Sequence, residues 1–213
     1  MQSNQAQSTR VTGSLIHRLE SVLECIPVET LFAQPQPLEV ELGAGDGSFL
    51  AKYALANPQR NFIGVERLLG RLRKIDRKGL RAGLTNLRLV RIEASYFLEF
   101  LLPKGSVDAL HVYFPDPWPK RKHRKNRLIN ERFTELAGRA LKPGGRIYLR
   151  TDDADYYSQM VRVFDGCAAF QKVETEPTLA AVITDFERNF HLRNVPTLAA
   201  SYRLEDAPIV RRN

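Results

Sequence analysis

The sequence predicts an α/β domain built around a mostly parallel sheet. Short apolar stretches rich in β-branched residues alternate along the chain with longer stretches of helical character. A glycine-rich turn follows the first of these strands, and prolines and glycines punctuate the segments between later elements. Strands separated by helical segments form parallel sheets with right-handed crossovers. At 213 residues, the chain is long enough for one sizeable domain of this kind.

The N-terminal residues precede this alternating pattern. Residues 1–10 are polar and are predicted to be disordered. Apolar residues recur at helical spacing over residues 15–23 and predict one amphipathic helix before Pro27. We therefore divide the chain into an N-terminal polar tail and helix, residues 1–36, and a main domain, residues 37–213.

The main domain is predicted to alternate strand and helix. Its strands are expected at residues 38–42, 61–66, 86–92, 107–114 and 146–151. Its helices are expected at residues 48–56, 68–82, 127–141 and 153–164. The third helix ends at a Lys-Pro-Gly-Gly sequence, as a proline and glycines after a helix do. Residues 199–204 are a further strand candidate.

Carboxylates mark the ends of the first three strands. Glu41 precedes Gly43 and Gly45 of the glycine-rich turn, Glu66 ends the second strand, and Glu93 follows the third. The glycines allow a tight turn and a close approach of a ligand to the backbone. A dinucleotide fingerprint would need a third glycine at position 48, which is a serine here.

Glu41 and Asp46 beside the turn would repel a pyrophosphate, but the carboxylates suit S-adenosylmethionine. That molecule has no phosphate; it carries a cationic amino group, a sulfonium, a ribose diol and an adenine amine. Glu66 is placed like the acid that accepts both ribose hydroxyls in nucleotide-binding α/β folds, and Glu93 is placed to accept from the adenine amine. A tightly packed turn flanked by surface glutamates is the alternative, above all for Glu93.

The fourth strand runs into a proline-rich loop and then into a basic run. Three prolines restrict the backbone, so Asp116 and Trp118 are expected on a stiff loop at the strand's carboxyl end, where open α/β sheets bind ligands. Six Lys or Arg residues follow within residues 120–127 and would neutralise phosphates without reading sequence. The predicted contacts with a nucleic acid are Trp118, Arg121, Lys122, Arg124, Lys125 and Arg127.

The overall charge favours a polyanionic partner, either a nucleic acid or an anionic membrane surface. The net charge is +8 and the pI is near 9.7. A second basic run lies on the helix expected after Glu66, and because a charge run usually solvates a helix face, we expect half of it or less to touch a nucleic acid. Its members are Arg67, Arg71, Arg73, Lys74, Arg77, Lys78 and Arg81.

Several classes of protein are disfavoured. No apolar run reaches spanning length and the first residues lack the apolar core of a signal peptide, so no membrane insertion is expected. Two distant cysteines and four scattered histidines indicate neither a disulfide framework nor a metal site. A reducing cytoplasm is the expected location.

Taken together, the motifs resemble those of bacterial tRNA (guanine-N7)-methyltransferases. They are E-x-G-x-G-x-G at 41–47, the strand-end Glu66, FPDPWPK at 114–120, TDD at 151–153 and TDFE at 184–187. The resemblance implies a Rossmann-like class I methyltransferase fold, with a mostly parallel seven-stranded sheet and helices on both faces. It also implies S-adenosylmethionine as methyl donor, a guanine in the variable loop of tRNA as acceptor, and a methyltransferase domain over residues 37–213.

The same resemblance assigns the site residues. Cofactor positions fall on Glu41, Gly43, Gly45, Glu66, Glu93 and Asp116, of which Asp116 is also the expected catalytic residue. Substrate positions fall on Lys120, Asp152, Thr184, Asp185, Phe186 and Glu187. This chain departs from the family at Glu93, where Asp or Asn is usual, and in the tail after Phe190. From the residues alone, Asp152 or Asp153 could equally cap the next helix, and Thr184 could begin a surface helix.

The expected chemistry needs alignment more than proton transfer. Guanine N7 has an in-plane lone pair and no proton, so Asp116 would orient the reactants and favour the developing positive charge. The base must be extruded from folded tRNA, with Tyr113, Phe114 and Trp118 as stacking candidates unless they belong to the core. The alternatives are a nucleotide-dependent oxidoreductase, a non-catalytic RNA-binding subunit, and a methyltransferase with another acceptor. Monomer and homodimer are both left open.

Overall fold

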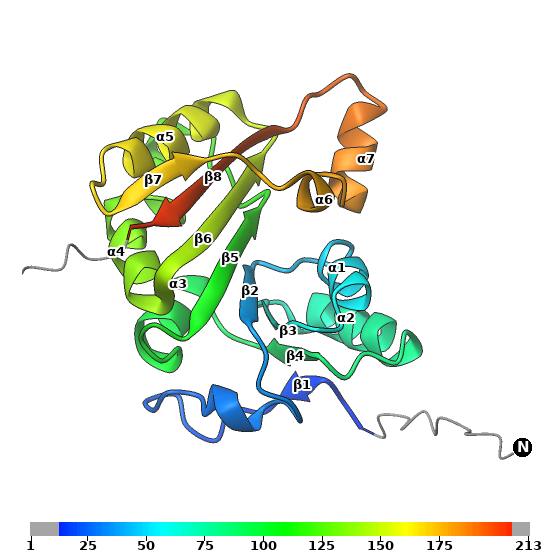
Figure 1. Cartoon of the computed structure of the whole chain (residues 1–213). Coiled ribbons are helices and arrows are strands. Elements are labelled where there is room, and N and C mark those ends of the chain that lie inside the picture. The colour runs from blue at the N-terminus through cyan, green and yellow to red at the C-terminus, as the bar shows by residue number, and fades with distance from the viewer. Residues whose placement is uncertain (1–12, 206–213) are drawn as a thin grey trace, which may run out of the picture.

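The computed structural model describes residues 13–205, and one mixed sheet forms their centre (Figure 1). Its strands are β1 (Ile16–His17), β2 (Leu38–Leu42), β3 (Asn61–Val65), β4 (Leu87–Val90), β5 (Val107–Tyr113), β6 (Leu141–Thr151), β7 (Phe170–Val173) and β8 (Leu198–Leu204). They lie in the order β1-β4-β3-β2-β5-β6-β8-β7. Neighbours from β1 through β6 are parallel, and β8 is antiparallel to both β6 and β7.

Helices cover both faces of this sheet, as expected. They are α1 (Leu50–Ala56), α2 (Leu69–Arg81), α3 (Ala94–Tyr96), α4 (Glu131–Ala140), α5 (Ala154–Asp165), α6 (Pro177–Ala180) and α7 (Asp185–His191). Figure 1 shows α1 and α2 on one face and α3, α4 and α5 on the other. Shorter turns are the 3-10 segments Val28–Thr30 and Arg121–Asn126 and the π-helical segment Phe97–Leu101. Strands β2 to β8 make up the seven-stranded sheet that the resemblance implies, and β1 adds an eighth strand at the edge. Strand β7 is not among the strands predicted from the residues.

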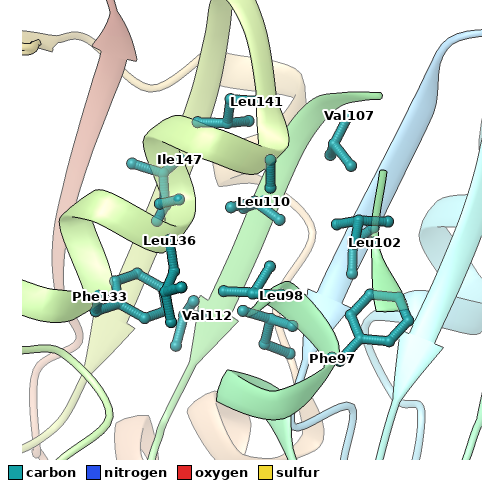
Figure 2. Close-up of a cluster of buried hydrophobic side chains, with 14 of the residues drawn as sticks. Phe97, Leu98, Leu102, Val107, Leu110, Val112, Phe133, Leu136, Leu141 and Ile147 are labelled. Carbon is teal, nitrogen blue, oxygen red and sulfur yellow. The ribbon is translucent and has the colours of Figure 1, made fainter. Parts of the chain in front are cut away.

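Two apolar cores separate the sheet from its helices. Alternation along β5 sends Leu110 and Val112 into one core and Ala109 and Tyr113 into the other. Figure 2 shows the first core, in which Leu110 and Val112 pack with side chains of α4, β6 and the π-helical segment. Fully burying one such aliphatic side chain contributes about 1.5–3 kcal/mol. Since both faces are covered, the central strands are almost entirely buried, and the burial extends to Glu39 and Glu41 of β2 and His111 of β5.

The amphipathic helix predicted over residues 15–23 is wrong. Ile16 and His17 instead pair in parallel with β4, while Leu15 is buried and Leu23 is 83% exposed. A Cβ on Gly79 of α2 would lie 2.4 Å from the end of the Leu15 side chain, so this glycine makes room for Leu15. Strand pairing and burial of Leu15 override the local helical spacing. The predicted disorder of residues 1–10 lies outside the described residues, and the division at residue 37 stays a prediction.

Parallel pairing brings the predicted motifs to one edge of the sheet. The carboxyl ends of β2, β3, β4 and β5 lie side by side because each strand pairs with its neighbour in the same direction. The glycine-rich turn, Glu66, Glu93 and the proline-rich loop each follow one of these ends. The fold therefore gathers segments that are up to about 75 residues apart in the chain.

Candidate functional site

Two adjoining cavities open at the carboxyl ends of the central strands. Their volumes are about 280 and 170 Å³. Because Gly43, Arg71, Tyr113, Phe114 and Asp116 line both cavities, we treat the two as one space and call it the strand-end cleft. The six residues assigned to the cofactor from the sequence all line this cleft, namely Glu41, Gly43, Gly45, Glu66, Glu93 and Asp116.

Glu41 is buried in the cleft with an unsatisfied carboxyl oxygen. Its side chain is 4% exposed, and Oε2 has no hydrogen-bond partner among residues 13–205. Burial raises the pKa of Glu41 to about 8; the charge of Arg150 opposes this, and those of Asp46 and Glu66 add to it. Because a buried polar atom without a partner is destabilising, this position suits a ligand that brings a hydrogen-bond donor or a positive charge.

Glu66 ties the glycine-rich turn to the start of α2. Its Oε2 accepts a hydrogen bond from the Gly45 amide at 3.1 Å, and its Oε1 accepts one from the Leu68 amide at 2.7 Å. Each carboxylate oxygen keeps further acceptor capacity toward the cleft. Gly43 lies at φ +78°, and a Cβ there would meet no atom within 4 Å. The backbone at Gly43 therefore lines the cleft without a side chain, next to the fixed carboxylate of Glu66.

Glu93 lies at the other side of the cleft and also caps a helix. Its Oε2 accepts from the Tyr96 amide at 2.8 Å, which makes it the N-cap of α3. The side chain is exposed and lines the larger cavity next to Ile92. The structure thus gives Glu93 a structural role, and its contact with an adenine stays a prediction.

The proline-rich loop carries backbone strain on both sides of Asp116. Phe114 and Trp118 have positive φ angles of 50° and 44°, a conformation that is unfavourable for residues other than glycine by about 1–3 kcal/mol each. Asp116 between them is exposed and lines both cavities. The Trp118 indole lines the larger cavity and stacks on the His123 ring, with centroids 5.8 Å apart and planes 3° apart.

The aromatic stacking candidates differ in their surroundings. Tyr113 is 5% exposed, and its hydroxyl bonds to buried His111 at 2.9 Å, so it belongs to the core while its ring lines the cleft. Phe114 is half-buried, and its ring centroid lies 5.6 Å from that of Phe190 and 6.4 Å from that of Phe186. Phe186 is 49% exposed at the mouth of the cleft.

The structure corrects the prediction that Arg127 contacts RNA. Its side chain is only 2% exposed and donates to the Pro117 carbonyl, Gln159 and Asp155. Its guanidinium also lies over the Tyr156 ring, 4.8 Å from the centroid. The other cations of the run are exposed on or beside the 3-10 segment Arg121–Asn126, and they are Lys120, Arg121, Lys122, Arg124 and Lys125.

The TDFE segment lies at the cleft, but three of its four side chains already have partners within the protein. Thr184 and Glu187 form a capping box at the start of α7, with bonds of 2.9 and 2.6 Å. Arg150 also donates to the buried Glu187 carboxylate at 3.1 Å. The helix start that the residues alone allow is confirmed, and base recognition by Glu187 stays a prediction. Asp185 pairs with Lys52 at 3.3 Å on the surface.

Lys120 and Asp152 do not line the two cavities of the cleft. Asp153 rather than Asp152 caps α5, because its carboxylate accepts from the Tyr156 amide at 2.7 Å. Asp152 is half-buried beside it and accepts no hydrogen bond from another residue in the part of the chain that the structure describes. Its carboxylate is therefore free of the capping role.

Sequence reasoning missed Arg150. This residue is 4% exposed and donates to Glu187 and to the carbonyl oxygens of Leu179 and Val182, while its guanidinium lies 4.5 Å from the centroid of the Tyr113 ring. It thereby holds α6 and the start of α7 next to β6. An arginine inside the apolar strand RIYLRT was the available signal, because a charge in a buried strand needs partners.

Other kinds of site find no support within residues 13–205. No group of three His, Cys, Asp or Glu side chains there is arranged to hold a metal ion. None of the helices described is both long enough and apolar enough to cross a bilayer.

Comparison with known proteins identifies relatives of this chain. A family model described as "Putative methyltransferase" matches residues 35–199. The tRNA (guanine-N(7)-)-methyltransferase of Rubrobacter xylanophilus is 35% identical over 170 residues, which cover 80% of this chain and 76% of that protein. The protein of the same name from Chromohalobacter salexigens is 38% identical over 144 residues, which cover 68% of this chain. The chain spans 58% of the length of that second relative.

A solved structure supports the same assignment at the level of fold. The crystal structure of the 16S rRNA methyltransferase KamB has a TM-score of 0.62 and 19% identity, covering 86% of this chain and 95% of that chain. At this identity the likeness shows the shared fold alone, which is the class I methyltransferase fold expected from the sequence. The family match over residues 35–199 and the identity to the Rubrobacter protein show that the chain belongs to this methyltransferase family.

Proposed function

We propose that this protein transfers a methyl group from S-adenosylmethionine to N7 of a guanine in the variable loop of tRNA. The observation that carries the donor assignment is the buried carboxyl of Glu41, whose Oε2 lacks a partner within residues 13–205. The acceptor assignment is supported by the names of the curated relatives and by the exposed basic run beside the cleft. The proposal includes a cytoplasmic location and leaves monomer and homodimer as alternatives.

The donor set of the cleft fits S-adenosylmethionine. Glu41 would hold the cationic amino group, since an ionised carboxylate there gains a partner and a compensating charge. Glu66 would accept from the ribose hydroxyls with the capacity that its two backbone bonds leave open. When bound, S-adenosylmethionine supplies the activated methyl group. The acids around the glycine-rich turn disfavour a dinucleotide at the same place.

The acceptor side of the cleft would position a base. Guanine N7 carries its own lone pair, so the residues need to align the base and tolerate positive charge on the ring. Asp116, exposed on the strained loop, would accept hydrogen bonds from the purine and stabilise that charge. Alignment of two reactants can contribute as much as about 7–11 kcal/mol in the most favourable models. The cations near Trp118 would hold the flanking phosphates.

The test is methylation of unmodified tRNA with labelled S-adenosylmethionine, followed by aniline cleavage at 7-methylguanosine. We expect one cleavage, at a variable-loop guanine. A matched tRNA with 7-deazaguanine at that position lacks the accepting nitrogen and should take no label there. Label that survives this replacement, or label with no cleavage, would contradict N7 as the acceptor atom. Failure of the protein to bind S-adenosylmethionine would contradict the donor.

A further inference from the structure

Helix α2 presents a positive surface that the proposed chemistry does not use. Six cationic side chains on the helix or just before it are exposed, and they are Arg67, Arg71, Arg73, Lys74, Arg77 and Arg81. We call these six residues the basic face of α2. None of them forms an ion pair with another residue in the range 13–205. Lys78, the seventh cation, is paired with Asp46 at 3.1 Å.

The acid within α2 does not neutralise this face. Asp76 is the one acidic residue of the helix sequence. Its Oδ1 accepts from the Leu15 amide at 2.7 Å, and its Oδ2 accepts from the Ser14 hydroxyl at 3.2 Å. Its carboxylate therefore serves to anchor the segment before β1. The exposed cations keep their full charge toward solvent.

This arrangement is unfavourable for the helix itself. Arg73, Arg77 and Arg81 follow one another at four-residue spacing, so like charges repel along one side. Arg71 lies in the first turn, where the helix dipole is positive and an acid would be favoured. A face that only keeps a helix in solution usually mixes both signs of charge. Uncompensated cations at these positions point to a polyanionic partner.

The basic face begins at the strand-end cleft. Arg67 and Arg71 line its larger cavity, together with Trp118 and Asn126 from the other basic segment. From there α2 runs for 13 residues, about 20 Å at 1.5 Å per residue. Figure 1 shows α2 on the outside of the sheet, beside α1. The cleft thus lies between two separate sets of exposed cations.

We propose that the basic face of α2 binds the sugar-phosphate backbone of the acceptor RNA away from the reacting nucleotide. The RNA would cross the cleft with one segment on α2 and another on the cations of residues 120–125. Contacts of this kind set the position of the RNA without reading bases. The inference rests on the proposed function, since it assumes an RNA acceptor, and it identifies a docking surface that begins at the cleft and extends away from it along α2.

The test uses a neutral triple variant, Arg73→Gln, Arg77→Gln and Arg81→Gln. These three residues lie outside the lining of the cleft, so donor binding and kcat at saturating tRNA should stay unchanged. We expect the Kd and KM for tRNA at 0.15 M salt to rise by about tenfold or more. The slope of log K against log salt should fall by about 2, at about 0.7 per lost phosphate contact. The change removes repulsion along the helix, but it also removes the favourable charge of Arg81 in the last turn, so the stability of the helix should change little.

A matched control separates a local contact from a general loss of charge. Lys104, Arg162 and Lys172 are exposed, form no ion pair within residues 13–205 and lie outside the lining of the cleft. Replacing these three with Gln removes the same net charge and should leave the salt slope near the wild-type value. Equal effects of the two triple variants would overturn the proposal. Because the binding slope needs no catalysis, the result also stands if the wild type binds tRNA without methylating it.

Discussion

The Nε of Arg127 donates a hydrogen bond to the carbonyl oxygen of Pro117 at 2.7 Å, which places a buried guanidinium against the loop that carries Asp116. The same side chain donates to Asp155 at 2.6 Å and to Gln159 at 2.8 Å, both on α5. The loop is strained and has no regular structure of its own. Arg127 therefore connects it to a helix packed in the core, and we expect it to act as a positioning residue.

Replacing Arg127 with Met should disturb the loop and slow methyl transfer. The change removes three hydrogen bonds and leaves the Pro117 carbonyl without its donor, which costs about 1–3 kcal/mol of stability. Trp118 is the single tryptophan of the chain and lies on this loop, so its fluorescence reports the local change directly. We expect a shifted emission and a kcat lowered by about tenfold or more, with partial recovery in Arg127→Lys.

Arg124→Met is the matched control for this variant. Arg124 also pairs with Asp155, at 3.2 Å, but it is exposed and does not contact Pro117. The Arg124→Met variant should leave the tryptophan emission unchanged. Because Arg124 is itself a predicted RNA contact, a higher KM for tRNA in this variant does not bear on the positioning role. If Arg127→Met and Arg124→Met have the same emission and the same kcat, the positioning role is wrong.

The strands and the assembly of the cleft could be predicted from the sequence for a simple physical reason. Central parallel strands are buried on both faces, so β2, β3 and β5 appear as short stretches rich in apolar residues with clear ends, although β2 and β5 also contain charged residues. Once they are parallel, their carboxyl ends must share one edge. Glu41, Glu66 and Asp116 therefore come together without any knowledge of side-chain packing.

What the sequence did not reveal depends on distant partners. The two residues of β1 are a strand only because they pair with Leu89 and Val90, far along the chain. The four residues of β7, two of them exposed, pair with β8 at the other edge of the sheet. In the basic run, nothing in the sequence distinguishes Arg127 from Arg121 and Arg124. Arg127 is buried because it contacts Gln159 and Asp155 of α5. The helix predicted from residue 127 begins only at Glu131, as α4, because Asn130 is its N-cap and accepts a hydrogen bond from the Phe133 amide at 3.1 Å.

Binding of S-adenosylmethionine should release a proton from Glu41. Burial raises the pKa of Glu41 to about 8, so at pH 7 the carboxyl is mostly protonated before binding. A cationic amino group next to it favours the ionised form, and affinity should rise from pH 6 toward pH 8, by at most about tenfold per unit. Calorimetry in buffers of different ionisation enthalpy should detect close to one proton released at pH 7.

Two variants test this assignment. Glu41→Gln should bind the donor more weakly and release no proton, whereas Glu93→Gln should keep the release because Glu93 is exposed. A raised carboxyl pKa also destabilises the folded state as pH rises above the unfolded value of about 4.5. Glu41→Gln should therefore stabilise the free protein at pH 7, by up to about 3 kcal/mol. Proton release that persists in Glu41→Gln would contradict the role.

Asp116→Asn should slow methyl transfer while leaving the fold intact. The side chain is exposed, so an isosteric amide creates neither a cavity nor a buried unpaired group. The amide loses the negative charge that would stabilise the positive purine ring, and removal of one such group typically lowers kcat by about 10²-fold or more. Rates at saturating tRNA and donor measure this directly. Wild-type turnover under those conditions would exclude Asp116 from the reaction.

A buried carboxylate beneath the cleft should control the acid stability of the protein. Glu39 is 1% exposed, accepts from His111 Nε2 at 2.7 Å and pairs with Arg60. Burial by itself would raise the pKa of Glu39, but the hydrogen bond and charge of His111, with the charge of Arg60, hold it below the usual value. The ionised form thus stabilises the fold above the unfolded pKa of about 4.5, and this stabilisation is lost as pH falls through the lower folded pKa.

Glu39→Gln should therefore lose stability at pH 7, by about 3–5 kcal/mol, because it breaks a buried ion pair and leaves its partners unpaired. The difference between wild type and variant should shrink as pH falls below about 4.5. Urea unfolding from pH 3.5 to pH 8 measures both. His111 also bonds to Tyr113 at 2.9 Å, so the variant should loosen one wall of the cleft. A stability difference that is constant over this range would show that Glu39 ionisation does not contribute.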